Sequence, residues 1–260
     1  MEGAVHGAMR YYHLLKNLSN WWLYLFVKFG GLKRRDPLLF RTRRGVSVEV
    51  PRRLLQTFKE IFMDECYMRG LEAPVPENPN IVDIGANAGY FSLFAASRFP
   101  GAWIFAFEPV PANFALLDRN RKLNPHVRLS CLSAAVAGRS GEITLTLDPE
   151  DTFPTSATII GEPEAQRKNT VRVEAVTLPD IFAKYRIDRL DLLKMDCEGA
   201  EYEILYHTPG DVLAKICQMA LEVHKGPEPG QNIEALSDYL GKQGFGTRQR
   251  PVGMLWAWRR

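Results

Sequence analysis

Residues 80–96 constrain the fold of this chain most, because they combine a buried strand, a glycine turn and a helix. Residues 81–84 form a nearly continuous apolar run, which is typical of a strand covered on both faces. Gly85 and Gly89 permit a sharp turn and a close approach of a ligand to the backbone. Residues 90–97 follow as a helix without a breaker. Such a helix points free N–H groups into the crevice where open α/β sheets bind ligands.

The turn Gly85-Ala-Asn-Ala-Gly89 is neither the Gly-x-Gly-x-x-Gly of dinucleotide folds nor a P-loop. By itself it would indicate an ordinary tight turn. Asp83 precedes it at the strand end and suits the amino-acid part of S-adenosylmethionine better than a pyrophosphate. Glu108 ends a second apolar strand, 103–107, about 20 residues further on, where a carboxylate grips ribose hydroxyls. Together these residues predict a site for a nucleoside-type cofactor.

The basic residues of the chain are concentrated in its first part. Residues 1–60 carry twelve Lys or Arg against four Asp or Glu, whereas the remainder carries 21 against 26. The four cysteines form no Cys-x-x-Cys pair, and no signal-peptide pattern is present, so we expect a cytoplasmic protein. The apolar run 21–27 is too short to span a bilayer.

We expect an N-terminal basic extension over residues 1–72 and a second domain over 73–260. The extension contains apolar residues at helical spacing up to residue 30, a hairpin over 38–50 and an amphipathic helix over 52–68. The first helix either packs on the main domain or contacts a membrane surface or a partner, in which case residues 11–35 would lie at the inner face of a membrane.

The middle of the chain predicts more of the cofactor site. Asn113 lies near the start of a helix, and residues 127–136 read as a third strand that runs into small residues. Ser133 and Ala134 therefore either border an adenine ring or serve close packing. The polar stretch 148–170 is long for a compact domain, and we expect it to cover the substrate.

A second chemical cluster follows the apolar strand 190–195. Asp196 and Glu198 come directly after this strand, and Glu222 and His224 end the next one. Because parallel strands end at one edge of a sheet, these groups would face the same crevice as Asp83. Carboxylates there can act as a base, position a hydroxyl, bind a divalent ion or complement a helix N-terminus.

Three segments together resemble the FkbM-type methyltransferases. They are Val82-Asp-Ile-Gly-Ala-Asn-Ala-Gly-Tyr-Phe91, Phe107-Glu-Pro109 and Lys194-Met-Asp-Cys-Glu-Gly-Ala-Glu201. The resemblance covers about residues 78–225. It implies a Rossmann-like class I methyltransferase fold, α/β with a mostly parallel seven-stranded sheet and helices on both faces. It also implies S-adenosylmethionine as cofactor and a hydroxyl of a sugar, glycan or natural product as acceptor.

The predicted site follows from the residues and from this resemblance. The predicted cofactor-binding residues are Asp83, Gly85, Ala86, Asn87, Gly89, Glu108, Pro109, Asn113, Ser133 and Ala134. The predicted catalytic residues are Asp196, Glu198, Glu222 and His224. Asp196 is the expected base, with Glu222 or His224 assisting, unless a divalent ion held by Asp196, Glu222 and Glu198 takes that role.

Two other functions are compatible with the sequence: an NAD-dependent oxidoreductase, and a catalytically inactive Rossmann-like binding scaffold. The absent Gly-x-Gly-x-x-Gly weakens the first. We expect a small-molecule or glycan partner and no nucleic acid, because aromatic and basic residues are not interleaved in the basic segment. The sequence does not determine the oligomeric state.

Overall fold

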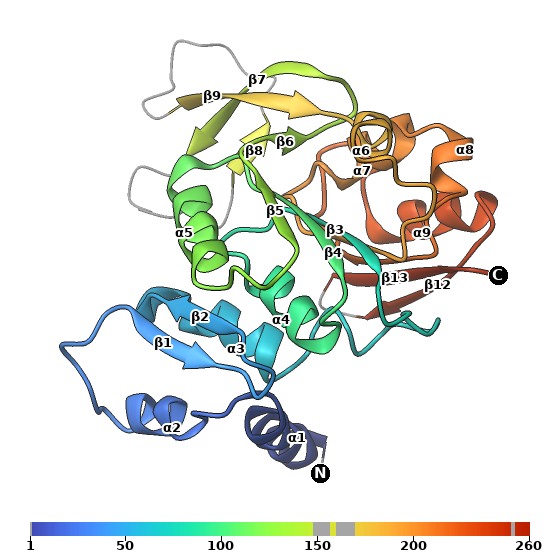
Figure 1. Cartoon of the computed structure of the whole chain (residues 1–260). Helices are drawn as coiled ribbons and strands as arrows, with labels where there is room; N and C mark the ends of the chain where they lie inside the picture. Colours follow the sequence, from blue (N-terminus) through green and yellow to red (C-terminus); the bar gives the residue numbers. More distant parts are fainter. Residues whose placement is uncertain (1, 148–156, 160–169, 251–252) are drawn as a thin grey trace.

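The computed structural model describes residues 2–147, 157–159, 170–250 and 253–260 (Figure 1). A seven-stranded sheet forms its centre. In order across the sheet, the strands are β12 (Phe245–Arg250), β13 (Met254–Arg259), β11 (Gln218–Glu222), β10 (Leu192–Met195), β3 (Asn80–Ile84), β4 (Trp103–Phe107) and β5 (Leu129–Leu132). From β11 to β5 all neighbours are parallel, and β13 is antiparallel to both of its neighbours. The predicted mostly parallel sheet is confirmed.

Alternate residues of each strand face two different apolar cores, as the pleat requires. Ile81 lies in one core, whereas Val82 and Ile84 lie in the other. The helices divide in the same way. The first core contains side chains of α4 (Tyr90–Arg98) and α5 (Pro111–Lys122), and the second contains those of α6 (Leu178–Tyr185), α7 (Glu201–His207), α8 (Gly210–Leu213) and α9 (Ile233–Lys242).

The N-terminal extension packs against the first face of the sheet. Its elements are α1 (Glu2–Asn17), α2 (Trp22–Lys28), β1 (Leu38–Arg41), β2 (Ser47–Val50), the 3₁₀ helix η1 (Arg52–Leu54) and α3 (Leu55–Phe62). The predicted hairpin is confirmed as β1–β2, but the helix predicted to reach residue 68 ends at Phe62. Phe58 stacks on Phe40 and Phe62, and Phe62 contacts Phe94 of α4 edge-on. The extension and the sheet thus share one core, and the boundary near residue 72 stays a prediction.

Two asparagines at the end of α5 hold the extension in place. The Asn124 amide accepts from the backbone N–H of Ser47 and donates to its carbonyl, both at 2.7 Å. Asn120, fully buried, accepts from the N–H of Glu49 at 2.7 Å and donates to the carbonyls of Glu49 and Ala88. These side chains satisfy the backbone groups along the free edge of β2 as a neighbouring strand would.

The region after β5 differs from the prediction. The expected strand 127–136 is split, because β5 joins the large sheet whereas β6 (Ala135–Val136) joins a second one. The second sheet has the order β6–β9–β7–β8, with β7 (Gly141–Leu147), β8 (Ala157–Ile159) and β9 (Thr170–Val176). Most of the 148–170 stretch, expected to cover the substrate, lies outside the described residues. The edge strand β12 has the polar sequence FGTRQR, and the hydrophobic pattern does not predict it.

We expect Asn120→Leu to lower the free energy of unfolding by about 2 kcal/mol, because it leaves buried backbone groups of β2 and Ala88 without partners. Urea unfolding followed by circular dichroism measures this. Lys122→Ala on the same helix, where the lysine is exposed, is the matched control and should change stability by less than about 0.5 kcal/mol. Equal effects of the two substitutions would contradict the bridging role of Asn120.

Candidate active site

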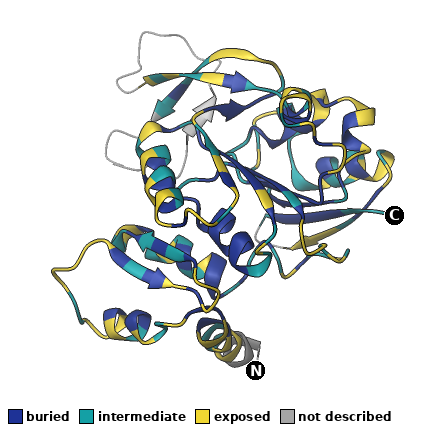
Figure 2. Ribbon diagram, viewed as in Figure 1, coloured by how far each residue is buried: buried dark blue, intermediate teal, exposed yellow. Residues whose placement is uncertain are grey.

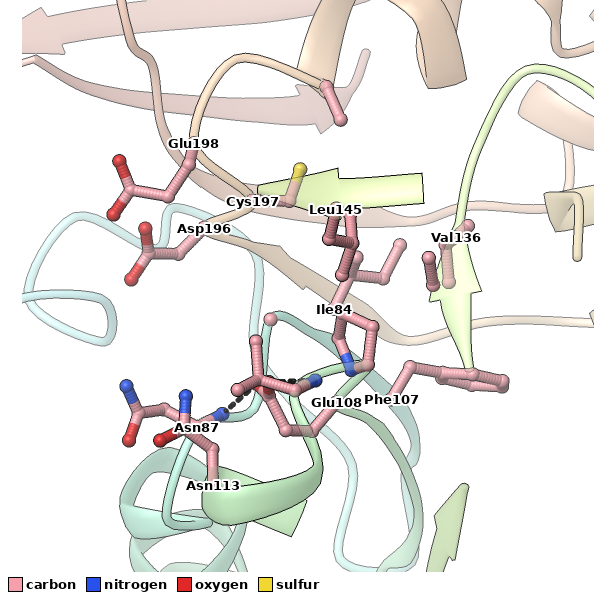
Figure 3. Close-up of a pocket in the computed structure, with 15 residues that line it drawn as sticks. Ile84, Asn87, Phe107, Glu108, Asn113, Val136, Leu145, Asp196, Cys197 and Glu198 are labelled. Atoms are coloured by element: carbon pink, nitrogen blue, oxygen red, sulfur yellow. Dashed lines mark hydrogen bonds between the residues drawn. The ribbon is translucent and has the colours of Figure 1, made fainter. Parts of the chain in front are cut away.

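The loops after β3, β4 and β10 surround a narrow cavity at the carboxyl edge of the parallel strands (Figure 3). Its empty volume is about 620 Å³. The lining residues are Ile84, Gly85, Asn87, Phe107, Glu108, Pro109, Val110, Asn113, Ala135, Val136, Leu145, Asp196, Cys197, Glu198 and Ala200. The second sheet contributes three of these residues, so β6 and β7 form part of the wall.

The lining of this cavity has a polar end and an apolar end. In Figure 3, Asp196 and Glu198 lie on the left with Asn87 below them, Val136 lies on the right, and Leu145 lies between the two sides near Cys197. Glu108 also lies between the two sides. A ligand with a charged part and a flat, less polar part would match this arrangement.

The glycine turn brings the loops after β3 and β10 close together. Gly85 has φ +68°, and a Cβ there would lie 1.7 Å from the carbonyl oxygen of Asp196. Asn87 also has a positive φ, +49°, which is uncommon outside glycine. Its backbone N–H donates to Glu108 at 2.8 Å, but its buried side-chain oxygen has no hydrogen-bond partner. An unpaired buried oxygen at a cavity wall is a group that a ligand can satisfy.

Glu108 is buried at the end of β4. Its two carboxylate oxygens accept hydrogen bonds from the N–H groups of Asn87 and Val110, at 2.8 and 2.9 Å. Burial raises the pKa of Glu108 to about 7, although these hydrogen bonds and that of Asn113 oppose the shift. The carboxylate is therefore held in place but is only partly ionised near neutral pH.

Asp83 does not line the cavity, contrary to the sequence prediction. It is fully buried, and it accepts a hydrogen bond from Ser92 at 2.7 Å. Its other oxygen lies 3.2 Å from the ammonium group of Lys194. Burial disfavours the ammonium charge, but Asp83 and Asp196 outweigh this, and the pKa of Lys194 is raised. Lys194 also donates to the carbonyl of Gly85 at 2.8 Å, so this ion pair supports the glycine turn.

A second, open cavity of about 1,700 Å³ adjoins the first. The two cavities share four lining residues: Gly85, Asn87, Asp196 and Glu198. The second cavity also contacts α3 through Thr57, Glu60 and Ile61, so the N-terminal extension forms one of its walls.

Tyr67 joins two of the predicted acids at this junction. Its hydroxyl lies 2.9 Å from Asp196 and 3.0 Å from Glu222. A hydroxyl has one proton, so Tyr67 can donate to only one of the two carboxylates at a time. The second contact is a hydrogen bond if that carboxyl group is protonated and donates to the Tyr67 oxygen. Burial, together with repulsion by Asp196, raises the pKa of Glu222. The pair Asp196–Glu222 is thus suited to hold a proton.

His224 faces two acids rather than the cavity centre. Its Nδ1 lies 3.0 Å from the fully buried Glu201, and its Nε2 lies 3.4 Å from Glu198. The hydrogen bond with Glu201 raises the pKa of His224 to about 9. An imidazolium cannot accept a proton, so this arrangement does not support the predicted role of His224 as a general base. Glu201 is the first residue of α7. Among the acids that follow β10, it is the one whose position indicates a structural role.

The other predicted cofactor residues are placed as follows. Pro109 and Asn113 line the first cavity, Ala86 lines the second, and Gly89 forms the N-terminus of α4 with φ +81°. Ser133 and Ala134 line a separate cavity bordered by α6, and the next two residues border the first cavity instead. Residues 133–134 and 135–136 thus line two different cavities, because the chain leaves the large sheet after β5, and the adenine border stays a prediction.

Two residues of the site were not predicted from the sequence. Tyr67 lies in the extension, 129 positions from Asp196, and nothing in its local sequence distinguishes it. Lys194 lies inside a mostly apolar strand, and its register opposite Asp83 is seen only once β10 pairs with β3. A lysine within a buried strand is itself unusual and was the available signal.

The strand order, with one antiparallel strand next to the edge, and a ligand cavity at the carboxyl ends of β3 and β4 define a Rossmann-like class I methyltransferase. Residues 83–246 match the methyltransferase FkbM domain, and the chain belongs to this family of methyltransferases. This excludes the NAD-dependent oxidoreductase that the sequence left open.

Curated relatives support the same family. The chain is 34% identical over 222 residues to "Methyltransferase sdnD" of Sordaria araneosa, which covers 74% of this chain and 83% of that protein. It is 30% identical over 193 residues to "31-O-demethyl-FK506 methyltransferase FkbM" of Streptomyces tacrolimicus. That match covers 64% of this chain and 73% of that protein.

The solved structure of methyltransferase FkbM from Methylobacillus flagellatus KT has the same fold, with a TM-score of 0.52 at 14% identity. The similarity covers 79% of this chain and 53% of that chain. At this identity the likeness concerns the fold alone.

We expect Asp83→Asn to lower the free energy of unfolding by about 3–5 kcal/mol, because it leaves the buried Lys194 charge without its opposite. Urea unfolding measures this, with Asp188→Asn at an exposed position as the control. A loss below about 1 kcal/mol would show that the ion pair does not support the fold.

Proposed function

We propose that this chain is an S-adenosylmethionine-dependent O-methyltransferase that acts on a hydroxyl of a sugar, glycan or natural product. The observation that carries the proposal is the junction of the two cavities. Gly85, Asn87, Asp196 and Glu198 belong to both, so a methyl donor in the narrow cavity would meet an acceptor in the open one at these residues.

The narrow cavity fits the proposed cofactor. In this proposal Glu108 accepts hydrogen bonds from ribose hydroxyls, and the unpaired oxygen of Asn87 accepts from the ammonium group. The apolar end near Val136 suits the adenine ring. The cofactor supplies a methyl group already activated by its sulfonium, so the chain's own residues mainly position the acceptor and remove its proton.

The open cavity favours an acceptor with several hydroxyl groups. Acidic and aromatic side chains line it, among them Glu60, Tyr67, Glu222 and Trp256. Carboxylates accept hydrogen bonds from hydroxyls, and aromatic faces contact the apolar surface of a ring. The name of the Streptomyces tacrolimicus relative specifies methyl transfer to oxygen 31 of demethyl-FK506, and it supports oxygen as the methylated atom.

In the proposed reaction the pair Asp196–Glu222 takes the acceptor proton. In the transfer, a bond forms between the acceptor oxygen and the methyl carbon while the carbon–sulfur bond of the sulfonium breaks. The hydroxyl proton passes to the carboxylate pair, and the products are a methyl ether and S-adenosylhomocysteine. Tyr67 keeps the two acids in position, since its hydroxyl contacts both.

Calorimetric titration with S-adenosylhomocysteine at pH 6 and pH 8 tests the cofactor site. Ribose hydroxyls donate to the ionised carboxylate, whose fraction rises with pH through the pKa of Glu108, about 7. We therefore expect the affinity to increase roughly tenfold from pH 6 to pH 8. Glu108→Gln should weaken binding and abolish this pH dependence, whereas Glu142→Gln, at an exposed position, should keep both. No binding by the wild type would favour the inactive scaffold.

Tyr67→Phe should lower kcat with little change in cofactor affinity, because it removes only the hydroxyl between Asp196 and Glu222. We expect a reduction of about tenfold to a hundredfold. The measurement is transfer of radiolabelled methyl to the best acceptor of a glycoside panel, with S-adenosylhomocysteine binding as the parallel readout. Tyr206→Phe, in which the lost hydroxyl contacts Gly230 at the surface, is the matched control. An unchanged kcat in Tyr67→Phe would remove Tyr67 from the mechanism.

We also propose that the N-terminal extension rests on an anionic membrane surface. Among the described residues nine large apolar side chains are exposed, and six of them lie between Met9 and Phe29. Trp22 and Phe26 on α2, and Phe29 directly after it, recur at helical spacing, and exposed positions are visible there in Figure 2. The exposed basic residues 33–35 follow directly. No helix in the described part of the chain is long and apolar enough to span a membrane.

Co-sedimentation with phosphatidylserine-containing vesicles tests this surface. We expect binding at low salt that weakens as salt rises, because the basic residues are screened. Replacing Trp22, Phe26 and Phe29 by serine should reduce the bound fraction severalfold. Trp103→Ser, which removes an exposed tryptophan elsewhere, is the control. Equal binding by both variants would contradict a role of α2.

A further inference from the structure

Three potential metal ligands lie beside the junction of the cavities: Asp196 and Glu198 line both cavities, and His224 lies 3.4 Å from Glu198. Asp196, Glu198 and His224 each place one ligand atom within 4.8 Å of the other two. They come from different parts of the chain, since Asp196 and Glu198 follow β10 whereas His224 follows β11. All three side chains are partly exposed, so an ion and its remaining water ligands can reach them.

The contact of Nδ1 with Glu201 fixes the orientation of the His224 imidazole. Its Nδ1 lies 3.0 Å from Glu201, whose side chain is fully buried and also accepts from the backbone N–H of Cys197 at 3.2 Å. The Nε2 atom therefore faces Glu198, from which it is 3.4 Å away. Metal-binding histidines usually have a carboxylate on one imidazole nitrogen and the metal on the other, and here the other nitrogen faces the second proposed ligand, Glu198.

We propose that Asp196, Glu198 and His224 bind a divalent cation, Mn²⁺ or an ion of similar preference, beside the acceptor hydroxyl. The ligand set favours such an ion, because Mn²⁺ accepts carboxylate oxygens together with an imidazole nitrogen. Ligand atoms on opposite sides of a small divalent ion lie about 4.2–4.4 Å apart. The cluster reaches this span if the side chains shift by roughly half an ångström.

This inference rests on the proposed methyltransferase function and deepens it. An ion at this place would lower the pKa of the acceptor hydroxyl, which makes proton removal easier. Asp196 would then serve as a ligand, and Glu222, on the other side of the Tyr67 hydroxyl, would accept the proton. The imidazole must lose its Nε2 proton to bind the ion, so protons and the ion compete for the same position.

Calorimetric titration of the chelator-treated full-length protein with MnCl₂ tests the site at pH 8, where proton competition is weaker than at pH 6. We expect one saturable ion per chain. Glu198→Gln and His224→Gln should each reduce the affinity at least tenfold. Glu201→Gln should reduce it about tenfold to a hundredfold by releasing the imidazole. His126→Gln, at an exposed position, is the matched control and should bind like the wild type.

Thermal unfolding with and without MnCl₂ provides a second readout, since an ion that binds only the folded state raises Tm. We expect this increase in the wild type and in His126→Gln but not in Glu198→Gln, whose fold circular dichroism verifies. Absence of saturable binding, or binding that persists unchanged in both ligand variants, would overturn the metal site. S-adenosylhomocysteine titration in chelator separates the two proposals: cofactor binding without manganese binding removes only the metal, and loss of cofactor binding removes the methyltransferase itself.

Discussion

The buried ion pair between Asp83 and Lys194 underlies the rest of the site. The two residues lie opposite each other in the register of β3 and β10, at the centre of the sheet. Lys194 also donates to the carbonyls of Ile84 and Gly85, so one ammonium group links two strands and the glycine turn. Removing both charges from water is costly, and the pair is maintained only because its geometry and extra hydrogen bonds compensate for that cost.

The same lysine allows several acids to gather at one edge of the sheet. Asp196 lies 3.9 Å from its ammonium group, and attraction to Lys194 partly offsets the burial of Glu222. Without a central cation, carboxylates this close would repel each other and some would be protonated. His224 provides a second positive charge for Glu198 and Glu201. The acids thus form two groups, one around Tyr67 and one around His224.

The N-terminal extension contributes to the site as well as to the surface. Its side chains continue the first apolar core, α3 forms a wall of the open cavity, and Tyr67 reaches the acids after β10 and β11. The backbone carbonyl of Tyr67 accepts from the indole N–H of Trp256 on β13, which holds the tyrosine against the sheet. The family match begins only at residue 83, so this wall comes from a part of the chain outside it.

The sequence alone determined the strand–turn–helix at residues 80–96, the parallel sheet and the carboxylate positions at strand ends, because hydrophobic periodicity and glycine turns are local properties. It also placed Glu108, Asp196 and Glu222 at one edge, since parallel strands end on the same side. Only the tertiary structure decided which way each side chain points. Asp83 points into the protein toward Lys194, and Ser133 and Ala134 line a neighbouring cavity. Tyr67 contacts Asp196 although it lies far from it in the sequence. These contacts depend on register and long-range packing, which local patterns do not encode.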